Sequence, residues 1–236
     1  MTDKTLSFAV LLAAIAFAVV PFFTSFNGYG PDAFPIPQID PPAQPAGYAF
    51  SIWGVIYIWL IVSGVIGMTR QLPTRTWYRA RIPLLMSLLA GVAWLPVAES
   101  NPIAATFLIW FMLITALLAL ARAPKENRWA FRAPLGLYAG WLGAASWVSV
   151  ALVGAGFGVL FDATTWAIII IVAATALSTG VLLRLPAIPE FGVAVIWALV
   201  AVVVKQGFST TPGVLAAVGA AWLALLTVRH IVSLRQ

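Results

Sequence analysis

The chain has 236 residues, of which 62% are hydrophobic and 8% charged, and its mean hydropathy is +1.01. Soluble domains carry about a quarter charged residues, so the composition excludes a water-soluble fold and predicts an all-α bundle of transmembrane helices. The formal charge of +6 comes from residues scattered in short loops rather than from a patch, which argues against nucleic acid as a partner.

Eight apolar runs each have roughly the 17 to 25 residues that a helix needs to cross the hydrocarbon core. They cover residues 6–23, 48–68, 82–98, 102–121, 133–157, 164–183, 188–206 and 211–228. Their similar lengths predict one continuous membrane domain. Pro96 is expected to kink or end the third run. A signal peptide over residues 1–25 stays an alternative for the first run.

The basic residues are distributed unevenly between the two ends of these runs. If the runs alternate in direction, one set of ends carries twelve of the thirteen basic residues, and the other carries only Lys205. The twelve are Lys4, Arg70, Arg75, Arg79, Arg81, Arg122, Lys125, Arg128, Arg132, Arg184, Arg229 and Arg235, whereas Asp32, Asp40, Glu99 and Asp162 lie at the other ends. The positive-inside rule then predicts an integral protein of the bacterial inner membrane with both termini in the cytoplasm.

One connection is long: residues 24–47 separate the first two runs and are rich in proline between Pro35 and Pro45. Loops of this length are usually functional or disordered. Proline fixes φ and stiffens a chain, so the segment is either a structured lid over the outer helix ends or an ordinary extended linker.

Small residues recur at a spacing of four in the fifth run, at Gly136, Gly140 and Ala144. Such a stripe lets a neighbouring helix approach closely, and we interpret it as helix packing. The last three runs are rich in Ala, Val and Ile and nearly free of polar groups. That composition favours a supporting scaffold over a site.

Residues suited to catalysis or metal binding are scarce. The chain has no cysteine and one histidine, His230 in the basic C-terminal turn, so neither a histidine metal site nor a Ser-His-Asp triad can be assembled within the membrane. No catalytic or metal-binding residue is predicted, and we do not expect an enzyme. Glu99 and Lys205 are the candidates for a polar gate at the outer ends, against solvated or snorkelling side chains.

Eleven tryptophans are unusual for this length. Trp77, Trp129 and Trp166 lie in loops or near helix ends and are interpreted as interfacial belt residues. A second group, in runs two to five, consists of Trp53, Tyr57, Trp94, Trp110 and Trp147. These side chains either converge on one cavity beneath the proline-rich loop, which would suit a flat, apolar, polycyclic ligand, or pack between helices and face lipid.

The segment Pro45-Ala46-Gly47-Tyr48-Ala49-Phe50-Ser51-Ile52-Trp53-Gly54-Val55-Ile56-Tyr57 resembles the start of the second helix in the TspO/MBR family of tryptophan-rich sensory or translocator proteins. The likeness continues with Ala93-Trp94-Leu95-Pro96, with Ile109-Trp110 and Thr115, and with Tyr138, Trp141 and Ala145. It covers residues 1 to about 158. Phe50 is one residue closer to Trp53 than in the family pattern, and Gly91 and Ser149 stand where the family has asparagines.

The resemblance implies a five-helix core over residues 1–158, with residues 159–236 forming three additional transmembrane helices. It further implies a small-molecule-binding protein of sensory or regulatory type that takes tetrapyrroles such as porphyrin or haem, and sterol-like ligands, beneath the first long loop. No cofactor is obligatory; the expected partners are the bilayer and an apolar ligand, and a homodimer stays open. The alternative is a secondary transporter of a small apolar or amphipathic solute.

The residues expected to line the ligand pocket are aromatic and would act by stacking. They are Tyr48, Phe50, Trp53, Tyr57, Trp94, Trp110, Trp141 and Trp147.

Overall fold

The computed structural model describes residues 3–24, 28–29, 33–69 and 75–234. Among the residues expected to mark the topology, Arg70, Arg235 and Asp32 lie outside these ranges. Within the described ranges, eight helices are long and apolar enough to cross a membrane, and every regular element is helical. The protein is therefore a polytopic helical bundle, as predicted.

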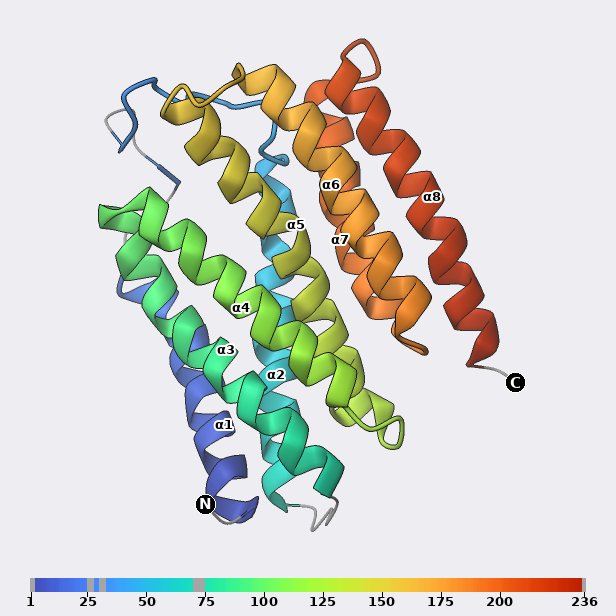
Figure 1. Ribbon diagram of the computed structural model, residues 1–236. Coiled ribbons are helices and arrows are strands. Elements are labelled where there is room, and N and C mark those ends of the chain that lie inside the picture. Colours follow the sequence, from blue (N-terminus) through green and yellow to red (C-terminus); the bar gives the residue numbers. More distant parts are fainter. Residues whose placement is uncertain (1–2, 25–27, 30–32, 70–74, 235–236) are drawn as a thin grey trace.

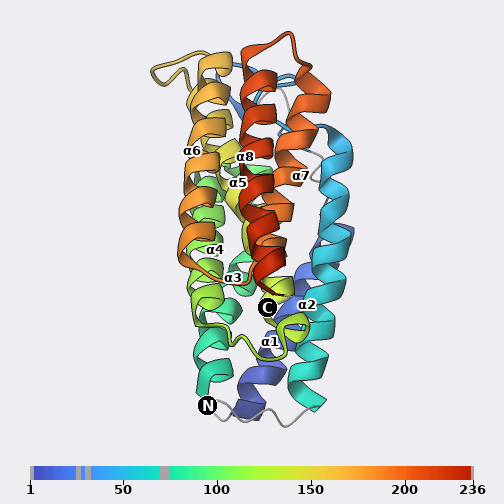
Figure 2. The ribbon, with the colours of Figure 1, turned by 90° about the vertical axis from the view of Figure 1, so that its right-hand side faces the viewer.

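The helices alternate in direction, with the N- and C-terminal ends at one end of the bundle and the long first loop at the other (Figures 1 and 2). They are α1 (Asp3–Val19), α2 (Ile52–Thr69), α3 (Arg75–Ser100), α4 (Pro102–Arg122), α5 (Arg132–Gly156), α6 (Ala163–Arg184), α7 (Pro189–Gln206) and α8 (Thr211–Ser233). Short 3-10 turns, η1 (Val20–Phe22), η3 (Gly47–Ser51) and η4 (Arg128–Ala130), flank α1, α2 and α5. Side-chain caps mark three of the starts: Asn101, Asp162 and Thr210 accept backbone N–H groups of α4, α6 and α8.

The third helix is longer than predicted. It begins at Arg75 instead of residue 82 and passes through Pro83 and Pro96 to Ser100. Pro96 removes one backbone donor but does not end the helix. The turn into α4 comes at Asn101, whose side chain caps the next helix.

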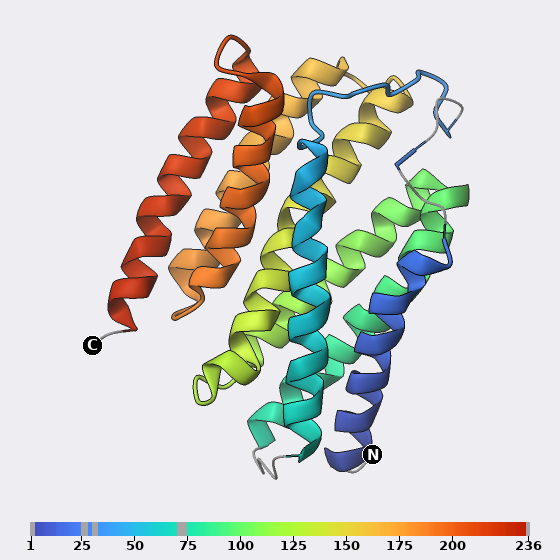
Figure 3. The same ribbon diagram turned by 180° about the vertical axis from the view of Figure 1, so that it is seen from behind.

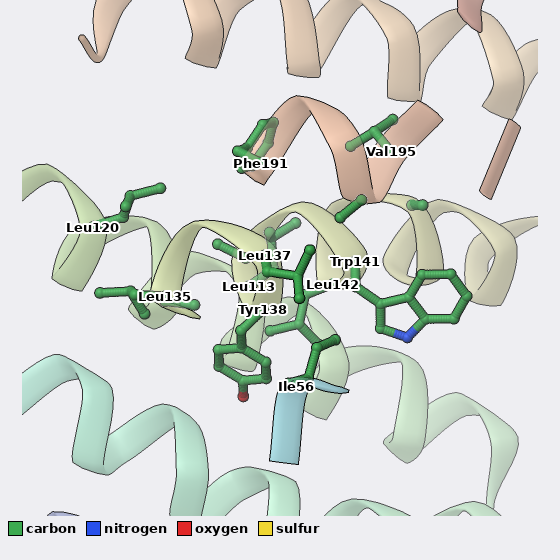
Figure 4. Close-up of a cluster of buried hydrophobic side chains, with 14 of the residues drawn as sticks. Ile56, Leu113, Leu120, Leu135, Leu137, Tyr138, Trp141, Leu142, Phe191 and Val195 are labelled. Atoms are coloured by element: carbon green, nitrogen blue, oxygen red, sulfur yellow. The ribbon is translucent and has the colours of Figure 1, made fainter. Parts of the chain in front are cut away.

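The centre of the bundle is α5, the most buried of the eight helices. It packs against α4 on one side and against α6 and α7 on the other, and α2 lies behind it in the view of Figure 1 and in front of it in Figure 3. Its Leu135, Tyr138 and Leu142 belong to the buried cluster drawn in Figure 4, together with residues of α2, α4 and α7. Each helix beside α5 therefore takes its position from this one element.

Gly140 is the tightest point of the α5–α7 contact. A Cβ atom there would overlap the carbonyl group of Phe191 and would lie 3.0 Å from the Cβ of Ala194. At Gly136 and Gly143 the nearest atoms are 3.5 and 3.8 Å away, which is ordinary contact. The stripe of small residues predicted to pack against another helix thus meets α7, and Gly140 is its critical position.

Two basic residues that marked topology in the sequence are also buried. Arg132 donates to the carbonyl oxygens of Ala123 (2.6 Å) and Pro186 (2.8 Å), joining the loops before α5 and after α6. Arg81 lies over the ring of Trp77, 5.0 Å from its centroid, and donates to Gly67 (3.2 Å). These cations therefore hold the ends of helices together.

The segment from residue 33 to residue 46, which we call the lid, runs across the end of the bundle opposite the two termini and leads into η3 and α2 (Figure 3). Its backbone is bonded at both ends: Ile36 donates to Gly156 of α5 (2.9 Å), and Ala46 donates to Ala201 of α7 (3.1 Å). Lys205 of α7 bonds Asp40 (2.7 Å) and the carbonyl oxygen of Pro41 (3.2 Å). Residues 33–46 of the long loop thus form a structured lid, held by α5 and α7.

Candidate functional site

A cavity of about 470 Å³ lies beneath the lid, against the half of α5 that is nearer to the lid. The α5 residues that line it fall on one helical stripe, from Trp141 through Ala145 and Ser149 to Leu152. Ala144 and Val148 lie beside this stripe on α5. The other lining residues come from α1 to α4, α6, α7, the turns η1 and η3, and the long first loop with its lid: Phe17, Pro21, Thr24, Gly28, Tyr29, Ala43, Gln44, Pro45, Phe50, Trp53, Tyr57, Trp94, Leu95, Ile109, Ile170, Ile171, Ala174, Val195, Ala198, Leu199 and Val202.

Aromatic rings form the inner wall of this cavity. Trp53 and Tyr57 sit one helical turn apart on α2 and stack, with centroids 5.3 Å apart and planes 18° from parallel. Trp141 of α5 meets Trp53 edge to face at 6.2 Å, and Phe50 meets Trp141 edge to face at 5.8 Å. Trp94 adds a ring from a third helix, α3, and is held by its indole bond to the carbonyl oxygen of Ala105 (3.0 Å).

Five of the eight aromatic residues expected at the pocket therefore line one cavity: Phe50, Trp53, Tyr57, Trp94 and Trp141. The other three are not among its lining residues. Tyr48, in η3, packs edge to face on Trp197 of α7, with ring centroids 5.3 Å apart. Trp110 and Trp147 pack on each other at 4.9 Å, because their positions on α4 and α5 point them into the contact between these two helices.

Phe17 is a cavity residue that the sequence argument missed. Its ring from α1 contacts Trp53 (5.5 Å), Tyr57 (5.1 Å) and Tyr138 (6.1 Å), each edge to face. It belongs to an apolar run with no distinguishing motif, so only the packing of α1 on α2 and α3 reveals its role.

The belt interpretation was wrong for one of its three tryptophans. Trp77 is 2% exposed and packs on Phe131 at 4.5 Å, because α3 begins before it and carries its ring inward. Trp129 is 67% exposed at the end of its loop and stacks on Trp59. Trp166 lies in the first turn of α6, where its indole nitrogen donates to Val159 (2.9 Å).

A short chain of hydroxyl groups forms the polar edge of the cavity near the lid. Ser149 and Thr106 share a hydrogen bond of 2.6 Å, and Thr106 donates to Pro102 (2.9 Å). Burial raises the pKa of Tyr29 to about 12, against the opposing effect of its hydrogen bond with Ser149. The Tyr29 hydroxyl therefore stays protonated at neutral pH and contributes no charge to this edge.

The last helices contribute directly to the cavity wall, which the scaffold interpretation did not foresee. Three residues of α6 and four of α7 line it, and all are small or aliphatic: Ile170, Ile171, Ala174, Val195, Ala198, Leu199 and Val202. Apolar composition gave no signal for this role, because the same residues would suit lipid or a packed core.

The two candidate gate residues have different positions. Lys205 bonds the lid through Asp40 and Pro41, and it therefore bears on access to the cavity. Glu99 lies exposed at the outer end of α3 and is not among the lining residues. His230 lies near the opposite end of the bundle, where its ring bonds the backbone of Ile188 (3.3 Å) and Leu182 (2.8 Å).

The comparison with curated proteins and the comparison with solved structures each give no match. The sequence model of the TSPO-like protein family matches residues 4–230. This match extends past residue 158 and covers most of the three helices that were predicted to be additional to a five-helix core. The division of the chain at residue 158 stays a prediction. Eight apolar helices and a match over nearly the whole chain identify the protein as an integral membrane protein that belongs to the TSPO-like family.

Proposed function

We propose that this protein binds a flat, apolar ligand of the tetrapyrrole class, such as a porphyrin or haem, and acts as a sensor or regulator in the membrane. The observation that carries the proposal is the cavity of about 470 Å³ with Trp53 and Tyr57 stacked on its wall. Ligand pockets typically measure about 300 to 1,000 Å³ and are lined mainly by apolar and aromatic side chains. Offset stacking supplies about 0.5 to 1.5 kcal/mol per aromatic contact beyond area burial.

The proposed interaction is binding through ring faces, without a chemical step. The described lining offers indole, phenyl and phenol rings with a few hydroxyl and amide groups. His230, the one histidine of the chain, lies at the other end of the bundle. A bound haem would therefore be held by stacking and shape rather than by an imidazole bond to iron.

The proposal places the protein in the bacterial inner membrane, with both termini in the cytoplasm and the lid toward the periplasm. The unequal distribution of basic residues supports this orientation. The ligand would then reach the cavity from the outer leaflet or from the periplasmic side.

The test is binding of protoporphyrin IX at micromolar concentration to the purified protein, followed by tryptophan quenching and by the shift of the porphyrin absorption band. A Trp53→Ala, Trp94→Ala double variant removes two stacking faces, so we expect the dissociation constant to rise roughly fivefold or more. The matched control is Trp110→Ala with Trp147→Ala, which removes two indoles outside the cavity.

Equal losses in both double variants, or unchanged binding in the first, would contradict the proposed pocket. Uptake of porphyrin into proteoliposomes driven by a proton gradient would instead favour the alternative of a secondary transporter. Consumption of the porphyrin by the protein would favour an enzyme.

A further inference from the structure

Five indole N–H groups of the described residues donate a hydrogen bond to an oxygen atom, whereas the buried N–H of Trp141 does not. Trp59, Trp94, Trp166, Trp197 and Trp222 each donate to an oxygen at 2.9 to 3.0 Å. The Nε1 atom of Trp141 is buried without a hydrogen-bond partner among the described residues, and the side chain is 2% exposed. A buried donor without an acceptor is unfavourable and calls for an explanation.

The ring that carries this donor lines the cavity. Trp141 is one of the lining residues, and Figure 4 shows its indole nitrogen on the edge of the ring turned away from Val195 and α7. Trp147, on the same helix, also has a buried indole nitrogen without a partner, but it is not a lining residue. Only the first of these two donors therefore belongs to a residue of the cavity wall.

The electrostatic surroundings specify which acceptor fits. The polar side chains of the described lining are uncharged, among them Thr24, Tyr29, Gln44 and Ser149. A chamber of about 340 Å³ next to the lid shares Tyr29 and Gln44 with the cavity, and its charged member is Asp40. Lys205 is paired with that carboxylate at 2.7 Å.

An anionic substituent would therefore enter an apolar space whose adjoining charges, Asp40 and Lys205, already neutralise each other. Burying an ionised carboxylate without a cation is far less favourable than burying a neutral carbonyl that accepts a hydrogen bond. We infer that the ligand binds with its polar substituents uncharged, and that a neutral carbonyl or ester oxygen accepts the N–H of Trp141. This inference rests on the proposed function, because it concerns the form in which a tetrapyrrole occupies the same cavity.

The first experiment needs no variant. Binding of protoporphyrin IX and of its dimethyl ester is compared in lipid nanodiscs, with the porphyrin absorption band as the signal. We expect the ester to bind at least as tightly as the free acid. The carboxyl groups of the acid have ordinary pKa values near 4 to 5, so they begin to protonate as the pH is lowered from about 8 to about 5. Over this range the affinity for the acid should rise about threefold or more, whereas the affinity for the ester should stay constant.

The second experiment tests the donor. Trp141→Phe keeps an aromatic face and removes the N–H, so ester binding should weaken roughly two- to tenfold, the range expected for one neutral hydrogen bond. Trp147→Phe is the matched control, with the same substitution on the same helix but outside the cavity, and should leave ester binding unchanged. Thermal unfolding of both variants in detergent checks that the bundle is intact.

The outcomes distinguish a failure of this inference from a failure of the proposed function. If the acid binds several-fold more tightly than the ester, or if Trp141→Phe binds the ester like the unmodified protein, the inference is overturned while the proposed function stands. If neither porphyrin binds saturably, both fail.

Discussion

At the level of single residues, Phe17 of the cavity wall packs against Gly91 of α3. The TspO/MBR pattern has an asparagine at the position of Gly91, so its absence could have meant a lost polar group and an enlarged pocket. Instead, the Phe17 ring fills that space, with atoms 2.7 to 2.9 Å from where a Cβ of residue 91 would lie. The polar position has been replaced by an aromatic ring from another helix.

This packing makes a testable prediction about Gly91→Ala. Exchanging glycine for alanine in a helix normally stabilises by about 0.5 to 1 kcal/mol, but overpacking a tight site costs about 1 to 3 kcal/mol. We expect the clash with Phe17 to dominate and the melting temperature in detergent to fall.

Gly54→Ala is the control for Gly91→Ala, because no atom lies within 4 Å of a Cβ at Gly54. This variant should melt at the same temperature as the unmodified protein or higher. A Phe17→Leu change added to Gly91→Ala should recover part of the loss. If Gly91→Ala is as stable as Gly54→Ala, the described position of the Phe17 ring is wrong.

At the level of helices, α7 contributes to both the wall and the lid. It packs along α5 at Gly140, lines the cavity with Val195 and its neighbours, and bonds the lid through Ala201 and Lys205. Its Trp197 indole also donates to Ala49 in η3 (2.9 Å). The position of α7 therefore determines the width of the cavity and the position of its cover.

Gly140→Ala should separate α7 from α5. The added methyl group meets a backbone carbonyl, which cannot turn aside as a side chain can, so we expect a loss of about 1 to 3 kcal/mol in stability and weaker porphyrin binding. Thermal unfolding and the porphyrin absorption band measure the two effects.

The matched variant is Gly143→Ala, one turn further along the same helix, where the nearest atom is 3.8 Å away. It should be tolerated with little change in either measurement. Equal behaviour of the two variants would mean that the close α5–α7 contact is not needed.

At the level of the whole molecule, access to the cavity depends on the lid. Lys205 is largely covered, whereas Asp40 is 80% exposed, so their ion pair is of the partly exposed kind that contributes about 0.2 to 1 kcal/mol. Backbone bonds at Ile36 and Ala46 hold the rest of the lid. The ion pair is therefore suited to adjusting the rate of lid opening more than to fixing the fold.

Lys205→Met should accelerate porphyrin dissociation by up to about fivefold, the factor that corresponds to the free energy of such a pair. Stopped-flow mixing with excess unlabelled acceptor vesicles measures this rate. Exchanging the charges, with Asp40→Lys and Lys205→Asp together, should restore part of the slow dissociation, although the bond to Pro41 is lost.

Lys125→Met is the control for this experiment, because Lys125 is exposed in the loop between α4 and α5 at the other end of the bundle. It should leave the dissociation rate unchanged. A dissociation rate in Lys205→Met equal to that of this control would show that the ion pair does not hold the lid.

The proposed orientation can be tested on single cysteines, because the chain has none of its own. Lys125→Cys and Phe208→Cys place a thiol in exposed positions at opposite ends of the bundle. A membrane-impermeant maleimide added to intact spheroplasts should label Phe208→Cys and not Lys125→Cys. The reverse result would invert the assignment of the termini to the cytoplasm.

The sequence by itself determined the eight crossings, because helix length and hydropathy are set by the thickness of the bilayer and need no knowledge of neighbours. It also identified the family and five of the cavity aromatics, since Phe50, Trp53 and Tyr57 follow a local spacing and Trp94 and Trp141 a motif.

Only the tertiary structure decided which rings share one space. Trp110 and Trp147 carry the same indole as Trp53, yet they turn into a helix contact, and Trp77 is buried because α3 begins earlier than its apolar run. Phe17 and the α6 and α7 residues reach the cavity through helix packing that no local pattern encodes. In a chain that is apolar almost throughout, hydrophobicity cannot distinguish lipid, core and cavity, so the direction of each side chain follows from how the helices pack.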